Sequence, residues 1–431
     1  MIGVGGISMS GFAKFLLFRG KIVSGSDLKK NDIIEDLEKN GLIFFNNHSE
    51  KNITKDIDLV VYSGAIQENN SELKMAKKLK IPCIERSLFL GAFSKLFKKV
   101  IAISGSHGKT TTTALLGKIL LASNLNPTIA LGGEYSDLNC NFILGGSNIL
   151  VCEACEYRES FKYLKPDISV ITNIEPEHLD YYKNFNNELS AFCNFANSSK
   201  ISIVDENCDI LSTSIKVGKN EKSNYCYSGI CYNNGKAFFN VYCNKKLIGN
   251  FSVGLLGEHN VKNALFAIVV SLELGIDKTT IQIGLDSFKG VKRRNEFLTQ
   301  IDNTPIVCDY AHHPTEIMAS ISNAKLQFKK IMCVFQPHTY SRTSTLIEDF
   351  KGAFDQAYEL VLFKTYAARE KYDSNGSEVR LFQEVNIKRK KLFMRDLELI
   401  RYIKTKAKNF DLVLVLGAGD IYDIIKENLV N

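Results

Sequence analysis

The feature that most constrains the fold is a glycine loop set between an apolar run and a helical stretch. Val100–Ser104 is apolar enough for a buried strand, Gly105–Gly108 follows, and Lys109–Thr113 opens a helix. Backbone N–H groups of such a loop cradle phosphates, a lysine ammonium meets the β- and γ-phosphate oxygens, and a hydroxyl binds Mg²⁺. The usual spacing would put the first glycine at Ile103, so this loop is a shorter variant. The pattern predicts an ATP-binding α/β domain.

Three segments repeat this order of strand-like run, glycine and helical periodicity, which is typical of parallel α/β units. The length of 431 residues also favours about three domains. We expect α/β domains at residues 1–97, 98–294 and 295–431. Between Asp205 and Gly257, short aromatic and β-branched runs alternate with turns such as Asn233-Asn234-Gly235. That change of pattern predicts a small antiparallel β insertion in the central domain.

Composition places the chain among globular proteins. Hydrophobic residues make up 45% and charged residues 23%, so enough apolar surface exists to build a core. The net charge of +7 suits anionic small molecules as well as nucleic acid, and only Lys388–Lys391 is densely basic. We interpret that run as a solvated turn before a strand, and we expect no nucleic-acid partner.

Cysteine usage and apolar patterning bear on the compartment. Eleven cysteines without regular spacing argue against a disulfide framework and for a reducing environment, so we expect a cytoplasmic protein. Cys152 and Cys155 are interpreted as packing thiols. Lys14 and Arg19 interrupt the first apolar stretch, and no uncharged run approaches the roughly 18 residues of a membrane helix. We therefore expect no signal peptide and no membrane association, and the oligomeric state stays open between monomer and dimer.

A second glycine turn lies at the N-terminus. Gly3–Gly6 precedes a helical stretch, and Asp27 follows the next strand-like run at the distance of a ribose-binding acid. A dinucleotide fingerprint would require glycine or alanine at Ser8, so a nucleoside diphosphate is favoured over NAD, while a purely structural turn stays open. Only Met1-Ile2 precedes the first glycine, too short for the strand expected there, so we expect a truncated N-terminus.

Polar residues at strand ends could complete a metal site beside the ATP loop. Glu153 ends one apolar run and His178 follows another, and a hard dication between ATP and a second substrate needs oxygen ligands. Each residue alone is more often structural. Six of the seven histidines, however, lie in loop-like motifs, where binding residues concentrate. Arg293-Arg294, at the junction of the second and third domains, could reach a transferring phosphoryl group, with a surface pair as the alternative.

Together these motifs resemble the Mur ligases over essentially the whole chain. The motifs are the glycine turn with Ser8-Met9-Ser10, the Gly105–Thr113 loop, Glu153-Ala-Cys-Glu156, Asn173–His178, His259-Asn260 with Asn263, Asp309–Pro314, Phe335–His338 and Gly417–Asp420. The Asp309–Pro314 and Phe335–His338 segments resemble the branch that adds L-alanine, as does the lack of lysine from Asn184 to Ser199. Two positions depart from the family: Thr339 stands where arginine is frequent, which leaves Arg342 for the alanine carboxylate, and Asn295 replaces an aromatic residue.

The resemblance implies a three-domain fold. It implies an N-terminal Rossmann-like domain for a UDP-sugar, a central P-loop ATPase-like domain, and a C-terminal Rossmann-like domain for the ATP ribose and the amino acid. It also implies ATP and two Mg²⁺ ions as cofactors, with UDP-N-acetylmuramate and L-alanine as small-molecule partners.

The resemblance assigns roles to individual residues. The implied ATP contacts are Gly105, Ser106, His107, Gly108, Lys109, Thr110, Thr111, His259, Asn260, Asn263 and Asp309. The implied metal ligands are Thr110, Glu153 and His178. The implied UDP-sugar contacts are Gly3, Gly5, Gly6, Ser8, Met9, Ser10 and Asp27, and the implied alanine contacts are Tyr310, His312, His338 and Arg342. The implied catalytic set is Lys109, Glu153, His178 and one of Arg293 and Arg294 at the γ-phosphate.

The implied activity is an ATP-dependent amide ligation in peptidoglycan precursor synthesis, through an acyl phosphate that must be shielded from water. It predicts a large domain closure. Alternatives are another amide ligase of the superfamily, either folylpolyglutamate synthase, which Thr110–Thr113 and Asp309–Pro314 disfavour, or a muropeptide-recycling ligase. From other classes, an NAD-dependent oxidoreductase leaves the P-loop unexplained, and a nucleotide-binding regulator would bind ATP without turnover.

Overall fold

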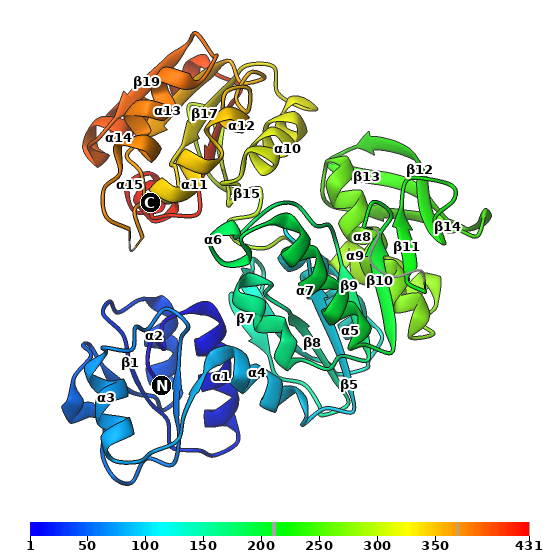
Figure 1. Ribbon diagram of the computed structural model, residues 1–431. Helices are drawn as coiled ribbons and strands as arrows, with labels where there is room; N and C mark the ends of the chain where they lie inside the picture. The colour runs from blue at the N-terminus through cyan, green and yellow to red at the C-terminus, as the bar shows by residue number, and fades with distance from the viewer. Residues whose placement is uncertain (209–212, 369, 431) are drawn as a thin grey trace. The chain divides into compact units, whose positions relative to one another are not determined.

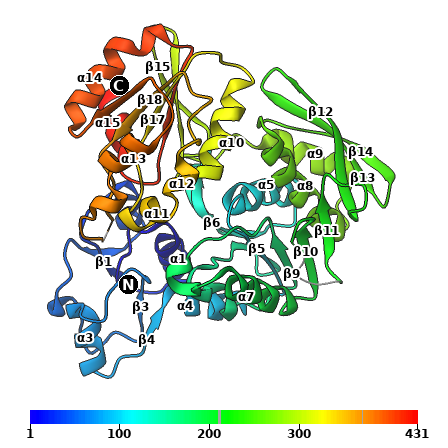
Figure 2. The same ribbon diagram turned by 45° about the horizontal axis from the view of Figure 1, so that its top comes forward.

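The computed structural model describes residues 1–208, 213–368 and 370–430. The chain divides into two compact units, Met1–Lys289 and Gly290–Asn431. Each unit is built on parallel strands covered by helices, which confirms the α/β class (Figures 1 and 2). No helix within the described residues is both long and apolar enough to cross a membrane.

The first part of the N-terminal unit holds two parallel strand pairs. Its strands are β1 (Ser24–Ser26), β2 (Ile43–Phe45), β3 (Val60–Tyr62) and β4 (Cys83–Glu85), and its helices are α1 (Ile7–Phe18), α2 (Asp32–Lys39), α3 (Ser71–Lys78) and α4 (Arg86–Ser94). Strand β1 pairs with β2, and β3 pairs with β4. Ile2 bridges both Ser26 and Tyr62, so the residue before the glycine turn joins the two pairs.

An aromatic core connects this part to the central sheet. Phe12 of α1 and Phe93 of α4 share one buried cluster with Phe142 and Phe161 from the central region. Gly11 allows the close approach, because a Cβ atom there would lie 2.5 Å from the Phe142 ring. The first two expected domains therefore form one compact unit in this structure.

The central sheet has ten strands in the order β14-β13-β12-β11-β10-β9-β5-β8-β6-β7. The strands are β5 (Lys99–Ser104), β6 (Thr128–Tyr135), β7 (Cys140–Ile143), β8 (Ile149–Glu153), β9 (Ile168–Ile171), β10 (Ile201–Asp205), β11 (Ile215–Gly218), β12 (Tyr225–Asn233), β13 (Lys236–Cys243) and β14 (Lys246–Val253). The helices are α5 (Lys109–Ala122), α6 (Leu179–Tyr182), α7 (Phe185–Asn197), α8 (Glu258–Glu273) and α9 (Lys278–Ser287). Because β5 lies between parallel β8 and β9, the carboxyl ends of these three strands meet at one edge.

The predicted antiparallel insertion is confirmed, and the structure shows in addition that it continues the main sheet. Strands β12, β13 and β14 form an antiparallel meander, and Asn234 and Gly235 turn between β12 and β13 with positive φ angles of 47° and 73°. The meander is continuous with the main sheet, because β12 pairs in parallel with β11 and β11 with β10.

The C-terminal unit has a six-stranded sheet in the order β15-β16-β20-β17-β18-β19. Its strands are β15 (Glu296–Ile301), β16 (Thr304–Asp309), β17 (Ile331–Phe335), β18 (Glu359–Phe363), β19 (Lys390–Phe393) and β20 (Leu412–Leu416). Its helices are α10 (Pro314–Lys325), α11 (Tyr340–Thr345), α12 (Ile347–Phe350), α13 (Glu378–Glu384), α14 (Asp396–Lys406) and α15 (Ile421–Leu429). All pairs except β15–β16 are parallel. The unit begins at Gly290, so Arg293 and Arg294 belong to it.

Candidate active site

The glycine loop is built as a phosphate cradle at the carboxyl end of β5. Gly105 has a φ of +127°, and a Cβ there would come within 2.2 Å of the Thr172 hydroxyl. Gly108 has a φ of +84°, and a Cβ there would come within 2.4 Å of the Asn263 side chain. Only glycine fits both places. The loop leads into the 14-residue helix α5, whose N-terminal backbone N–H groups and dipole favour an anion.

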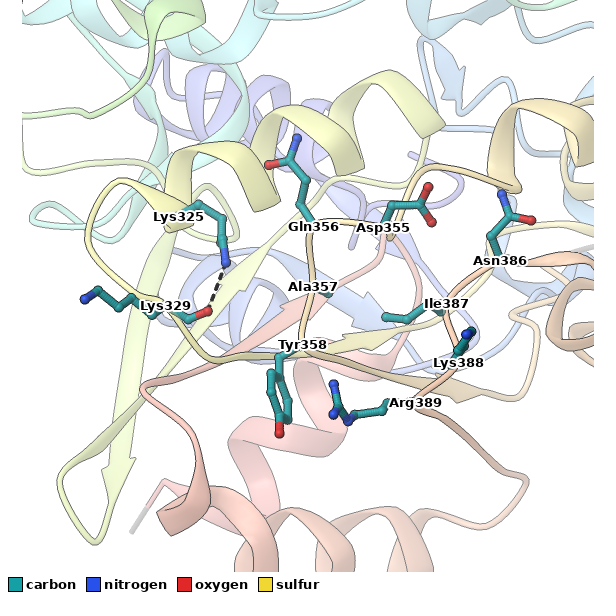
Figure 3. Close-up of a pocket in the computed structure, with 10 residues that line it drawn as sticks. All are labelled: Lys325, Lys329, Asp355, Gln356, Ala357, Tyr358, Asn386, Ile387, Lys388 and Arg389. Carbon is teal, nitrogen blue, oxygen red and sulfur yellow. Dashed lines mark hydrogen bonds between the residues drawn. The ribbon is translucent and has the colours of Figure 1, made fainter.

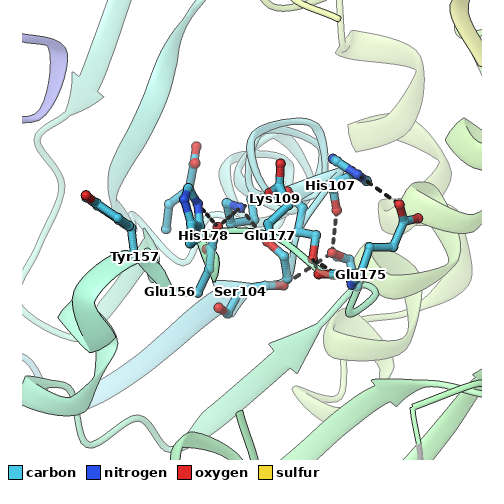
Figure 4. A network of polar contacts seen from close by, with 12 residues as sticks. Ser104, His107, Lys109, Glu156, Tyr157, Glu175, Glu177 and His178 are labelled. Carbon is cyan, nitrogen blue, oxygen red and sulfur yellow. Dashed lines mark hydrogen bonds and ion pairs between the residues drawn. The ribbon is translucent and has the colours of Figure 1, made fainter. Parts of the chain in front are cut away.

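Lys109 lies beside a buried carboxylate (Figure 4). Its Nζ is 3.0 Å from Glu156 Oε1 and also donates to the Ser106 carbonyl at 3.0 Å. Burial alone would lower the pKa of Lys109, but Glu156 outweighs that effect and holds the pKa above its ordinary value. The lysine is therefore an ammonium, directed by Glu156 toward the loop that would hold phosphates.

Glu156 itself connects the lysine to His178. The carboxylate is 3% exposed, and its Oε1 lies 3.5 Å from His178 Nε2. Although burial would raise the pKa of Glu156, Lys109 and His178 lower it to about 2. The other oxygen, Oε2, is buried without a hydrogen-bond partner among the described residues. That oxygen has unused capacity to accept a donor or bind a cation.

The donor set beside the loop fits magnesium. Thr110 donates its hydroxyl to Glu153 Oε2 at 3.1 Å, and the Gly132 N–H donates to Glu153 Oε1 at 2.6 Å. Glu156, Glu177 and His178 each offer one ligand atom within 4.8 Å of the others. Carboxylate and hydroxyl oxygens are the ligands that hard dications take. The predicted metal ligands thus fall into two groups, one at Thr110 and one at His178.

The loop after β9 is fastened to the phosphate loop. Asn173 Oδ1 accepts the His107 N–H at 2.8 Å, and its Nδ2 donates to the His107 carbonyl at 2.9 Å. The Glu175 N–H donates to the Ser106 hydroxyl at 2.9 Å. His178 follows with a φ of +55°, a left-handed conformation fixed by this local network.

The predicted adenine contacts lie at the start of α8. Asn260 donates to the Leu256 carbonyl at 2.8 Å, and Asn263 donates to Asn260 at 3.3 Å. Thr112 of α5 donates to Asn263 Oδ1 at 3.4 Å, so this helix start adjoins the phosphate-loop helix. His259, directly before Asn260 in the chain, is exposed.

The predicted UDP-sugar contacts divide into two sets. The Gly5 N–H donates to Asp27 Oδ2 at 2.9 Å, so the glycine turn and the acidic residue lie together. Met9 and Ser10 are 1% and 0% exposed, and the Asn141 amide donates to the Ser10 hydroxyl at 3.0 Å. Contact between these two buried side chains and a ligand stays a prediction.

A small pocket is lined by residues of α1 and by Glu153 at the end of β8. Its lining includes Ser8, Arg86, Asn141 and Glu153. Arg86 begins α4 directly after β4, and it is the one arginine among the lining residues. A half-buried guanidinium at this place suits a substrate carboxylate or phosphate.

The predicted amino-acid contacts come together in the C-terminal unit. Arg342 Nη1 lies 3.0 Å from His338 Nδ1, and the rings of His338 and His312 are 5.7 Å apart. The Tyr310 ring lies 5.5 Å from that of His312. Burial lowers the pKa of His312 to about 3 and that of His338 to about 4, where Arg342 adds to the effect. Both imidazoles are neutral near pH 7, and Arg342 is the cation of the cluster.

The two junction arginines have different surroundings. Arg293 forms an ion pair with Asp423 at 3.0 Å and donates to the Gly419 carbonyl at 3.3 Å. The Arg294 guanidinium lies over the Tyr310 ring at 4.9 Å. Burial raises the pKa of Asp309 despite the nearby Arg294 cation. Arg294, rather than Arg293, therefore lies with the predicted nucleotide and amino-acid residues.

Sequence reasoning gave no role to Glu156, Arg86 or Asn173. Glu156 and Asn173 lie within motifs that were singled out, but their partners are 47 and 66 residues away in the chain. The available signals were a second acid three residues after Glu153 and an arginine directly after a strand-like run.

Comparison with known proteins identifies the family of this chain. Family models described as "Mur ligase family, catalytic domain", "Mur ligase middle domain" and "Mur ligase, glutamate ligase domain" match residues 1–98, 103–271 and 293–419. These matches cover most of the chain. The chain belongs to the Mur ligase family.

Within that family, one activity recurs among the similar proteins. The UDP-N-acetylmuramate–L-alanine ligase of Clostridium kluyveri is 42% identical over 98% of this chain and 96% of its own length. That of Clostridium acetobutylicum is 40% identical over 98% and 95%. The crystal structure of the Thermotoga maritima UDP-N-acetylmuramate–alanine ligase superposes with a TM-score of 0.86 and 28% identity, covering 99% of this chain and 97% of the other.

Proposed function

We propose that this chain is an ATP-dependent ligase that joins L-alanine to the lactyl carboxylate of UDP-N-acetylmuramate in peptidoglycan precursor synthesis. The observation that carries the proposal is the meeting of the phosphate loop, Lys109 and two carboxylates at the carboxyl ends of β5 and β8. The full-length similarity to ligases of that name supports the choice of substrates. The reaction would take place in the cytoplasm, in keeping with eleven free thiols.

The loop and Lys109 would bind and polarise the ATP phosphates. A carboxylate is a poor electrophile, so the lactyl carboxylate attacks the γ-phosphorus and ADP leaves, giving an acyl phosphate. The amine of alanine then attacks the acyl carbon, and inorganic phosphate leaves. Negative charge gathers on the transferring phosphoryl group, where the Lys109 ammonium and the Arg294 guanidinium would stabilise it.

Thr110 and Glu153 would hold one Mg²⁺ ion, and His178 with Glu156 a second. When bound, the metal neutralises charge on the phosphates and on the lactyl carboxylate. This proposal of two ions rests on the two separate groups of donors at Thr110 and at His178.

The C-terminal cluster would bind alanine. Arg342 would pair with the amino-acid carboxylate, since the neighbouring imidazoles of His312 and His338 are neutral. The Tyr310 ring, which packs against the Arg294 guanidinium, would form one wall of the alanine site. The UDP-sugar would contact residues of the N-terminal unit, namely Gly3, Gly5, Gly6, Ser8 and Asp27. Arg86 would lie next to the lactyl carboxylate of this sugar.

The deciding experiment measures phosphate release from ATP and Mg²⁺ with UDP-N-acetylmuramate, with and without L-alanine. We expect release that depends on both substrates, and transfer of oxygen-18 from the lactyl carboxylate to phosphate. Phosphate release with a muropeptide but not with alanine would favour a recycling ligase. ATP hydrolysis at a rate that does not depend on UDP-N-acetylmuramate or L-alanine would refute the proposal.

A further inference from the structure

The C-terminal unit carries an open groove of about 790 Å³ that the proposed reaction does not use. Lys325 and Lys329 lie on one side of it, and Lys388 and Arg389 lie on the other (Figure 3). Asp355 is the one carboxylate among its lining residues.

This groove and the proposed alanine and ribose contacts lie at opposite ends of the parallel strands. Lys329 and Lys330 precede β17, Tyr358 precedes β18, and Arg389 precedes β19, so the groove lies at the amino ends of three parallel strands. Asp309 and His338, in contrast, follow the carboxyl ends of β16 and β17. The groove is therefore a separate site within this unit.

The four cations of the groove lack acidic partners. None of Lys325, Lys329, Lys388 and Arg389 forms an ion pair with a described carboxylate, and neither does Asp355 with a described cation. The nearby Asp411 accepts the backbone N–H groups of Lys329 and Lys330, at 2.9 and 2.8 Å. Gathering like charges without counterions is unfavourable, and an anion in the groove would relieve the repulsion.

Two of the four cations are held in place. The first is Arg389, whose guanidinium lies 4.4 Å from the centre of the Tyr358 ring. That ring is itself 4.8 Å from the ammonium of Lys330, which does not line the groove. Lys325 Nζ donates to the Lys329 carbonyl at 2.9 Å, which leaves its other N–H groups for a ligand. Positions fixed in advance reduce the entropy lost on binding.

We propose that this groove binds a small molecule bearing a diphosphate group. Its volume is within the range of roughly 300 to 1,000 Å³ typical of small-molecule sites, and it gathers four cations from two separate segments of the chain. A diphosphate offers two adjacent phosphates for these cations to pair with, and Arg389 offers the paired N–H groups that phosphate oxygens accept. The Asn386 amide also lines the groove, as does that of Gln356, whose oxygen accepts the Ser322 hydroxyl at 3.1 Å.

The test uses inorganic pyrophosphate as the probe and the full-length Lys109→Ala chain, in which the phosphate loop lacks its lysine. Isothermal titration calorimetry should detect pyrophosphate binding in this background. Adding Lys388→Gln and Arg389→Gln should weaken that binding about tenfold or more, because two charge-assisted contacts are lost. The matched control adds Arg401→Gln and Lys404→Gln, which remove the same charge from α14 and should leave the affinity unchanged.

Equal weakening by both pairs of substitutions would overturn the proposal, as would unchanged affinity in the Lys388→Gln, Arg389→Gln chain. Titration with ADP separates the sources of the diphosphate through the Lys388→Gln, Arg389→Gln pair: a larger loss of affinity for ADP than for pyrophosphate indicates a nucleotide, and an equal loss indicates the diphosphate alone. With Lys109 intact, the Lys388→Gln, Arg389→Gln chain should keep its ligase turnover, and loss of turnover would contradict a separate site. The inference is independent of the proposed function, since the binding measurements require no catalysis.

Discussion

At the residue scale, the contact between Lys109 and Glu156 makes a direct prediction. Glu156→Gln leaves the ammonium of Lys109, only 18% exposed, without its carboxylate. Breaking such a buried pair costs about 3 kcal/mol, so the free energy of unfolding should fall by that order. Urea denaturation near neutral pH measures it. Glu156→Asp keeps the charge and should lose clearly less, and equal losses in the two variants would contradict the role of charge.

Glu188 predicts a pH dependence of opposite sign to that of Glu156. Its side chain is fully buried on α7, and burial raises its pKa from 4.5 to about 7. A carboxyl with a raised pKa stabilises the fold below its ordinary pKa, and that contribution is lost as pH rises from 4.5 through about 7. Glu156, with a pKa of about 2, instead loses its contribution as pH falls below 4.5.

The measurement for Glu188 compares the wild-type chain with Glu188→Gln across this pH range. The variant carries no charge, so its unfolding free energy at about pH 8 should exceed that of the wild type. The gap should narrow as pH falls toward 4.5, where the native carboxyl is protonated. A gap that is constant with pH would mean that Glu188 does not titrate in the native protein.

Site residues were predictable from sequence where the whole motif that identifies them lies in neighbouring positions. Lys109 and Thr110 follow a strand and a glycine loop in one short run, and that order alone indicates a phosphate site. Glu156 was missed because its importance comes from burial against Lys109 and His178, which only the folded sheet brings about. Contact of Met9 and Ser10 with the UDP-sugar stays a prediction; both side chains are buried on α1, and the Asn141 amide donates to the Ser10 hydroxyl.

At the element scale, the β12–β13 turn tests how far local conformation sets stability. Gly235 has a φ of +73° and no neighbour within 4 Å of a Cβ placed there. Gly235→Ala should therefore cost about 1 kcal/mol through backbone strain alone. Gly254→Ala, at a position without positive φ and with 4.0 Å to the nearest atom, is the control and should be close to neutral. Equal effects on thermal unfolding would contradict this explanation.

The elements themselves were predictable to different degrees. The meander of β12 to β14 was expected because its turns and alternating residues are local signals. Its continuity with the main sheet was not, because it depends on β11, a four-residue strand whose partners are remote in sequence. Short parallel strands carry too little pattern to reveal their register.

At the scale of the whole molecule, the expected boundaries and the compact units differ for a physical reason. Three domains were expected, and three family models match residues 1–98, 103–271 and 293–419. The first two of these segments share a buried core that includes Phe12, Phe93 and Phe142, so they lie in one compact unit. The second boundary falls at Lys289–Gly290, close to the expected 294–295. A change of sequence pattern indicates where one kind of element gives way to another. It does not reveal which segments pack against each other, so it cannot show that two domains share a core.

The proposed acyl-phosphate intermediate predicts closure of the protein during the reaction. An acyl phosphate hydrolyses in water, and closure around it would exclude solvent. Small-angle X-ray scattering should therefore show a smaller radius of gyration with Mg²⁺, a non-hydrolysable ATP analogue and UDP-N-acetylmuramate than without them. Lys109→Ala should show a weaker decrease at the same concentrations, and an unchanged radius in the wild-type chain would exclude closure as the means of shielding the intermediate.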